Sequence, residues 1–160
     1  MTGTETREVI FSLGENRGGG MVDTLIGRKL EGEEMVSFVG ISDGYAAYTN
    51  AFRVHQLCWA HPQRKLRDLT ETQILESGAL EQCKITYKKF SKLYTRVRDE
   101  TKKEKDHPTN DEYRKNLKDE LMKQLEILTL SHKDDPPKLI TYKTTLWKYR
   151  EKYFVCILHP

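Results

Sequence analysis

The sequence predicts an α/β fold in which a partial core of about three strands plus helices is followed by a mostly α-helical region. Short apolar runs of strand length alternate with helical segments before Pro62, whereas nearly everything after Pro62 has helical periodicity. The chain has 160 residues, which suffices for one domain or for a small α/β core with a helical appendage. We therefore predict a core over residues 1–69 and a helical region over residues 70–160.

Composition excludes several classes of protein. Charged residues make up 32% of the chain, and no run of about 18 apolar residues exists, so a membrane protein is not expected. The net charge of +3 permits nucleic-acid binding without requiring it. Three scattered cysteines are too few for a disulfide framework, and the polar residues 1–8 lack the apolar segment of a signal peptide. We therefore expect a reducing compartment.

Three apolar runs predict the strands. They cover residues 8–13, 35–41 and 54–59, and Pro62 stops the last one. The second run is flanked by helical segments, a helix over 21–30 and one or two helical turns over 45–52, and is therefore interpreted as a buried inner strand.

Apolar spacings of three and four predict the helices after Pro62. A helix over 63–76 is expected to break at Gly78. A heptad-like seam follows, formed by Leu80, Cys83, Tyr87, Phe90, Tyr94 and Val97. The next helix is capped by Thr109 or Asn110, ends before the paired prolines 136 and 137, and carries Tyr113, Leu117, Leu121, Leu125 and Leu128. The last begins near Leu139 and carries Tyr142, Leu146 and Tyr149, and residues 153–158 form its end or an extended exit.

The first motif with possible chemistry is Ser42-Asp-Gly-Tyr-Ala-Ala-Tyr48. Asp43 stands where an apolar strand ends, and ligand sites of open α/β sheets gather at the carboxyl ends of strands. A carboxylate there can hold Mg²⁺, and two such ions on a carboxylate cluster can clamp a phosphodiester. The alternative is an ordinary Asp-Gly turn, which is the commoner meaning of these residues when they stand alone.

The second motif is Cys58-Trp-Ala-His-Pro-Gln-Arg-Lys65, at a predicted strand-to-helix junction. Cys58 and His61 have a spacing that suits zinc, but a structural zinc needs four ligands and no second pair lies at a matching distance. His61, Arg64 and Lys65 can instead contact DNA phosphates. The alternative is a solvated first helical turn beside a buried Trp59.

Taken together, the two motifs resemble the catalytic core of DDE-type transposases of the insertion sequence 66 family. In order, the matching elements are Val9 to Leu13, Arg17-Gly18, Leu25-Ile-Gly27, Ser42 to Tyr48, and Cys58-Trp-Ala-His-Pro-Gln-Arg64. Their joint occurrence is more specific than either motif alone, and it covers roughly the first 70 residues. The helical remainder is similar to the insertion that precedes the last catalytic element in these enzymes, although it carries no diagnostic motif.

The resemblance implies an RNase H-like fold with three acidic metal ligands and Mg²⁺ as cofactor. It also implies transposon-end DNA as partner and a location in the prokaryotic cytoplasm, at the nucleoid. It assigns Asp43 as the second acidic residue. We find no equivalent of the first, since Thr4-Glu-Thr6 lies too close to the first strand. The third would lie downstream of a His-Pro like His159-Pro160. We therefore expect an interior fragment that is inactive alone, because one carboxylate cannot position two divalent ions.

Three functions stay open on the sequence. The first is a catalytically incomplete transposase fragment, which self-associates through an exposed sheet edge or is complemented by another transposase polypeptide. The second is a DNA-binding remnant that uses Arg64, Lys65, Arg67 and the lysines of residues 84–92. The third is a helical interaction protein, in which the seam from Leu80 to Val97 pairs with another chain.

Overall fold

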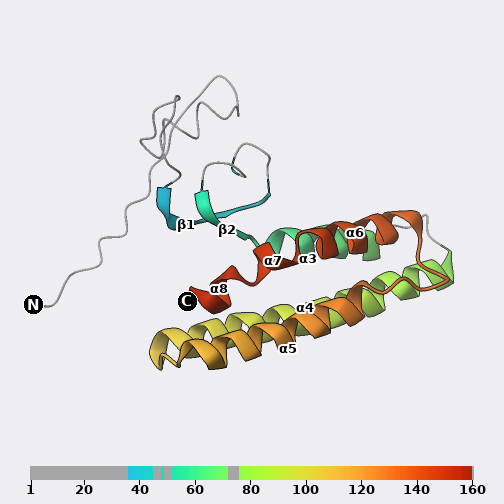
Figure 1. Cartoon of the computed structure of the whole chain (residues 1–160). Helices are drawn as coiled ribbons and strands as arrows, with labels where there is room; N and C mark the ends of the chain where they lie inside the picture. The colour runs from blue at the N-terminus through green and yellow to red at the C-terminus, as the bar shows by residue number, and fades with distance from the viewer. Residues whose placement is uncertain (1–35, 45–47, 49–51, 72–75, 160) are drawn as a thin grey trace, which may run out of the picture.

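The computed structural model describes residues 36–44, 48, 52–71 and 76–159 (Figure 1). This part of the chain is mostly helical and contains a two-stranded parallel sheet. Its elements are β1 (Val36–Ser42), β2 (Phe52–Leu57), α3 (Ala60–Thr70), α4 (Ser77–Asp106), α5 (Asp111–Thr129), α6 (Pro137–Lys148), α7 (Arg150–Tyr153) and α8 (Val155–Leu158). None of the described helices is both long and apolar enough to cross a membrane.

Several predicted elements lie outside the described residues. They are the strand over 8–13, the helix over 21–30, and most of the helical turns over 45–52. The Thr4-Glu-Thr6 segment lies there too. The described residues therefore contain two of the three predicted strands, and Phe52, expected in a helical turn, opens β2.

The two strands run parallel, with Val39 opposite Val54 and Ser42 opposite Leu57. Gly40 lies against the ring of Phe52, and a Cβ atom added there would come within 2.2 Å of that ring. The prediction of a buried inner strand is wrong for Ile41, whose side chain is 70% exposed. Successive strand side chains point to opposite faces, and no described element covers the face to which Ile41 points.

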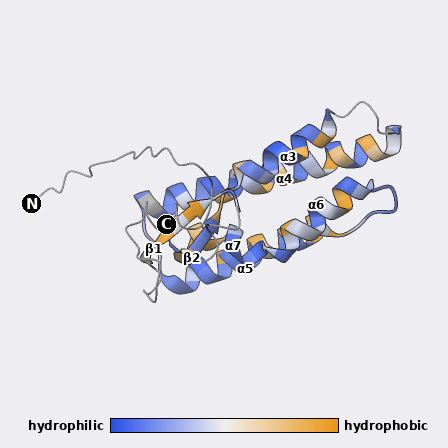
Figure 2. Cartoon of the chain, turned by 90° about the horizontal axis from the view of Figure 1, so that it is seen from above, coloured by the Kyte–Doolittle hydropathy of each residue, from blue (hydrophilic) through white to orange (hydrophobic). Residues whose placement is uncertain are grey.

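Four longer helices form the body of the molecule. In Figure 1, α4 and α5 lie side by side as a long antiparallel hairpin, with α3 and α6 stacked along it. Hydrophobic residues recur at intervals along otherwise hydrophilic helices (Figure 2), as expected for helices that each bury one stripe. The predicted α5 stripe is confirmed by its four buried leucines, whereas Tyr113 at its start is 47% exposed, and Tyr149 is likewise exposed.

The heptad-like seam of α4 packs inside its own chain. Cys83, Phe90 and Val97 are buried in the common core, and Tyr87 and Tyr94 pack against it. This burial argues against the alternative in which the seam pairs with another chain, because α3, α5 and α8 already cover α4. Burying the seam within the chain removes the apolar surface that a partner helix would need.

Local signals explain most helix ends. The side chain of Asn110 caps α5 by accepting a hydrogen bond of 2.8 Å from the Tyr113 amide, as predicted. Pro137 occupies the first turn of α6, where a missing N–H costs nothing. Gly78 does not break a helix, since it lies in the first turn of α4, and α3 covers 60–70 instead of 63–76. Pro62 fits the first turn of α3 for the same reason as Pro137.

Trp59 joins the strands to the helices. Its ring centroid lies 5.6 Å from that of Phe90 and 5.3 Å from those of Tyr153 and Phe154. Its indole N–H donates to the carbonyl of Tyr153 at 2.6 Å. One continuous core therefore contains residues from both sides of the predicted boundary at residue 69. That this boundary separates a catalytic part from an inserted part stays a prediction.

Gln56 ties the end of the chain to the sheet. This buried side chain donates to the carbonyl of Tyr153 at 3.0 Å and accepts from the amide of Cys156 at 2.9 Å. Residues 153–158, for which the sequence left a helix end or an extended exit open, belong to the short helices α7 and α8. Because α7 and α8 contact β2, the end of the chain returns to the sheet, and α6 packs against α3.

Candidate functional site

The two sequence motifs meet at one edge of the sheet. Because β1 and β2 are parallel, both carboxyl ends lie at the same edge. The amide of Cys58 donates to the carbonyl of Ser42 at 2.8 Å, which links the strand ends directly. Asp43 follows β1 at once, and His61 lies in the first turn of α3, which starts three residues after β2. Segments separated in the sequence therefore present their polar residues to one region.

The turn after β1 is shaped by Gly44 and Ser42. Gly44 has a φ of 86°, a left-handed conformation that favours glycine, and its amide donates to the Ser42 hydroxyl at 3.2 Å. A Cβ atom at this position would also meet the Leu57 side chain at 3.2 Å. The turn thus fixes the backbone on both sides of Asp43, whose side chain is exposed.

His55 lies on β2 beside this turn. Its Nε2 atom and the Ser42 hydroxyl are hydrogen-bonded at 2.8 Å, and its ring is buried. Burial lowers the pKa of His55 below its ordinary value, and the nearby charge of Lys152 lowers it further. The imidazole is therefore neutral near pH 7 and acts as a hydrogen-bonding neighbour of the turn.

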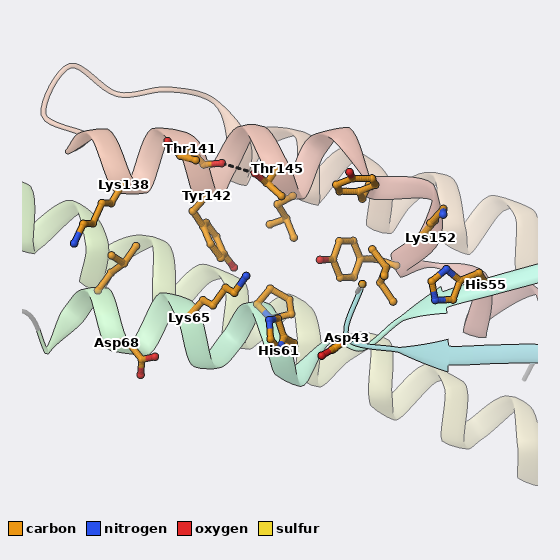
Figure 3. A pocket seen from close by; sticks show the side chains of 17 residues that line it. Asp43, His55, His61, Lys65, Asp68, Lys138, Thr141, Tyr142, Thr145 and Lys152 are labelled. Carbon is orange, nitrogen blue, oxygen red and sulfur yellow. Dashed lines mark hydrogen bonds between the residues drawn. The ribbon is translucent and has the colours of Figure 1, made fainter. Parts of the chain in front are cut away.

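A pocket of about 540 Å³ opens from this edge between α3 and α6. Asp43, Gly44, His55 and Leu57 line its strand end, and α3 forms one wall. Figure 3 shows α6 and α7 on the opposite side, with Asp43 and His61 close together at the end of the strands. The α6 and α7 wall comprises Lys138, Thr141, Tyr142, Thr145, Leu146, Lys152 and Tyr153, with Tyr149 in the link between the two helices.

Positive charge predominates around the pocket. Lys65, Lys138 and Lys152 line it from three different elements, and none of them has an ion-pair partner within the described part of the chain. Two carboxylates, those of Asp43 and Asp68, line it as well. An anionic ligand would therefore be attracted to the pocket as a whole, and a cation to the strand end near Asp43.

Two buried polar atoms of pocket residues have no hydrogen-bond partner among the described residues. They are the hydroxyl of Tyr142 and Nδ1 of His55. In Figure 3 the Tyr142 side chain and Lys65 point toward one another from α6 and α3. Burial raises the pKa of Tyr142 far above its ordinary value, so its phenol stays protonated and can donate a hydrogen bond to a ligand. Burial also raises the pKa of Tyr153, to about 12.

Three of the four site residues indicated by the sequence line this pocket. Asp43, His61 and Lys65 do so, with His61 and Lys65 one helical turn apart on the same face of α3. Arg64 is exposed and lies outside the pocket lining, because the helix turns it onto another face. The three residues come from two motifs, and only the parallel pairing of β1 with β2 brings them together.

Sequence reasoning missed the residues on the opposite wall. Lys138, Tyr142 and Lys152 reach the pocket only because the chain returns to β2 after the long helical hairpin. Lys138 and Tyr142 are four residues apart, which places them on one helix face, but the sequence does not say what that face meets. In the sequence, the only sign of this wall is that a polar residue stands beside each apolar position of α6.

The described residues do not form a complete metal centre. No three His, Cys, Asp or Glu side chains within them are arranged to hold an ion. Cys58 and His61 accordingly have no further zinc-type ligands among these residues, and Asp43 supplies one carboxylate at the strand end. A divalent ion prefers several oxygen ligands, so these side chains alone do not fit a tightly held Mg²⁺.

A comparison with known protein families identifies the family of the chain. The family model described as transposase IS66 family matches residues 1–155, which is nearly the whole chain. Searches of curated proteins and of solved structures find no match. Membership of a DDE transposase family implies DNA as partner and a divalent metal as cofactor. The chain thus belongs to the IS66 family of transposases.

Proposed function

We propose that this chain is a DDE-type DNA transposition domain with an RNase H-like core, in which Asp43 serves as one ligand of the catalytic Mg²⁺. The observation that carries the proposal is the shared carboxyl edge of β1 and β2, where Asp43 meets the start of α3. In open α/β sheets, such an edge is where ligands bind. The residues 1–69 then form the catalytic part, and residues 70–160 form an inserted helical part.

The chemistry of this edge suits phosphoryl transfer. A bound Mg²⁺ supplies electrostatic stabilisation of the phosphodiester oxygens during strand cleavage and joining. Asp43 would hold it, on a turn fixed by Gly44 and by the hydrogen bond between Ser42 and His55. His61 and Lys65, on the adjacent face of α3, would contact the DNA phosphates. Arg64, on another face of the same helix, would contact phosphates farther along the duplex.

We further propose that the chain does not cut or join DNA by itself. One carboxylate at the strand end leaves the coordination of two ions incomplete. The further oxygen ligands would come from a complementing transposase polypeptide. The isolated chain then binds Mg²⁺ weakly and keeps its affinity for transposon-end DNA.

A nicking and strand-transfer assay on transposon-end DNA with Mg²⁺ or Mn²⁺ tests the catalytic part of this proposal. We expect no cleavage by the chain alone. Metal-dependent cleavage that Asp43→Asn abolishes would contradict the proposed incompleteness while supporting the role of Asp43. Cleavage that survives Asp43→Asn would contradict the role itself.

The second candidate is a DNA-binding protein without catalysis, and the lysine-lined pocket favours it. Duplex binding measured against salt tests the DNA contacts of both candidates. Arg64→Ala with Lys65→Ala should reduce the slope of log K against log salt by about 1.8, since each phosphate contact contributes about 0.9. The exposed pair Lys102 and Lys133, substituted in the same way, provides the control. Equal salt slopes for both double variants would show that α3 does not contact the DNA.

A further inference from the structure

The helical region forms one side of the pocket, although its sequence carries no site motif. Lys138, Thr141 and Tyr142 lie on α6, and Lys152 lies on α7. The wall opposite, on α3, carries His61 and Lys65 (Figure 3). The site at the strand ends is therefore continued along the pocket between α3 and α6, which we call the channel.

The chemistry of this channel suits a polyanion. Three lysines along it outnumber the carboxylates of Asp43 and Asp68, and none of the lysines has an ion-pair partner in the described ranges. The buried hydroxyl of Tyr142 also has no partner there, and buried polar groups ordinarily have one. A phosphate oxygen would accept a hydrogen bond from this phenol and pair with Lys65, toward which Tyr142 points. Tyr149, half exposed on the pocket lining, offers a ring on which a base can stack.

The channel has the size of a small-ligand pocket, which is too small for a DNA duplex to enter. Its volume of about 540 Å³ lies within the range of about 300 to 1,000 Å³ that is typical of pockets for small ligands. A duplex would stay on the rim, where Arg64 is exposed. Single-strand sites characteristically combine a basic channel with aromatic side chains, and this channel has both.

We propose that the channel between α3 and α6 binds a single, unpaired DNA strand and leads it to Asp43, with Lys138, Tyr142 and Lys152 as its contacts on the helical region. This inference rests on the proposed function in taking DNA as the ligand. It goes beyond that function by assigning the C-terminal helices to substrate binding. It also predicts a preference for unpaired DNA ends over blunt ones.

The test uses the full chain and a fluorescent oligo(dT) in EDTA, so that no metal site contributes. Lys138→Ala with Lys152→Ala should lower the salt slope for oligo(dT) by about 1.4, because each contact with a single strand contributes about 0.7. Lys102→Ala with Lys133→Ala is the charge-matched control and should leave that slope unchanged. Blunt duplex binding should change little in either variant.

The variant Tyr142→Phe tests the proposed DNA contact independently of the lysines. Because this hydroxyl has no partner among the described residues, removing it should leave thermal stability unchanged or raise it. The same change should weaken oligo(dT) binding about tenfold, because the hydrogen bond to a charged phosphate is lost. A purely structural role for this tyrosine would change stability and leave binding unaffected.

Equal losses of oligo(dT) affinity in the two lysine double variants would overturn the inference. Failure of the wild-type chain to bind oligo(dT), with duplex binding retained, would overturn it as well. In either case the proposed function stands if the salt slope for duplex DNA still depends on Arg64 and Lys65. Loss of that dependence instead would count against the proposed function.

Discussion

The helical body and the strand edge contribute different properties to this protein. The helices α4, α5 and α6 bury apolar stripes in one core, with Phe90, Leu121 and Leu139 fully buried. The edge formed by β1 and β2 instead exposes Asp43 and Ile41, and it borders a pocket that two histidines and three lysines line. The body therefore supplies most of the stability, and the edge supplies the chemistry.

The strand edge and the helical body are held together by a few side chains. Trp59 and Gln56 are the main links, since both bond to the carbonyl of Tyr153. Through these links the helical region places α6 opposite α3. A change in the body should lower stability without specific effects on the site, whereas a change at the edge should alter binding at little cost in stability.

The largest expected effect concerns the core of the body. Phe90→Ala should lower the free energy of unfolding by about 4 kcal/mol, because it leaves a large cavity beside Trp59. Urea denaturation followed by circular dichroism measures this loss. Ile127→Ala, at a site that is 64% exposed on α5, should change stability by less than about 0.5 kcal/mol. Similar losses in the two variants would contradict the assignment of the core.

The buried ion pair of Asp135 and Lys143 should give the next largest effect. Lys143 Nζ lies 2.7 Å from the Asp135 carboxylate and also donates to the carbonyl of Leu130, so the pair ties the link after α5 to α6. Asp135→Asn should cost about 3 kcal/mol, because it leaves a buried ammonium without its counter-charge.

A double variant sharpens this prediction. Asp135→Asn combined with Lys143→Met should be less destabilising than Asp135→Asn alone, since no charge is then left buried. Chemical denaturation of the wild type, the two single variants and the double variant gives the coupling energy between Asp135 and Lys143. Additive losses would show that the two groups do not interact in solution.

The link between the two regions should give a smaller but more specific effect. Gln56→Ala removes the bonds to Tyr153 and Cys156 and should lower stability by about 2 kcal/mol. Because α7 is then held less firmly against β2, binding of oligo(dT) should weaken more than in Asp135→Asn. A fluorescence titration at a temperature where both variants are folded makes the comparison. Equal binding by the two variants would show that the link does not position the pocket wall.

The smallest effect expected is the pH dependence due to His55. Its pKa in the folded chain lies below the ordinary value of 6.5, because of burial and the charge of Lys152. Below pH 6.5 the unfolded chain therefore binds the proton more readily, and stability falls as the pH drops from 6.5 toward the folded pKa. Thermal melts of His55→Gln should show a flatter profile in this window. The exposed His107, changed to Gln, provides the control.

Local patterns predicted the helical body well, because each helix buries one stripe and periodicity records it. The buried leucines of α5 and the Asn110 cap were evident from spacing and residue type. The end of α3 at Thr70 was not evident, because helically spaced apolar residues continue in the sequence after Thr70. Whether the seam of α4 faced its own chain or another one was also undecidable, because both arrangements need the same spacing.

The candidate site was predictable only in part. Asp43, His61 and Lys65 lie in or beside two short motifs, and the family resemblance links Asp43 with His61. The wall from α6 and α7 depends on a contact between residues about one hundred positions apart, such as that of Gln56 with Cys156. No local pattern encodes such a contact, and so Lys138, Tyr142 and Lys152 could not be assigned from the sequence.

The most direct test of the central claim, that Asp43 holds a divalent ion where the two motifs meet, is cleavage of the chain by bound iron. Fe²⁺ replaces Mg²⁺ at such sites, and with ascorbate and peroxide it cuts the backbone next to its ligands. We predict fragments that end near residue 43 and near residue 61, present in wild type and in Asp119→Asn but lost in Asp43→Asn. Cuts elsewhere, or cuts that persist in Asp43→Asn, would contradict the account.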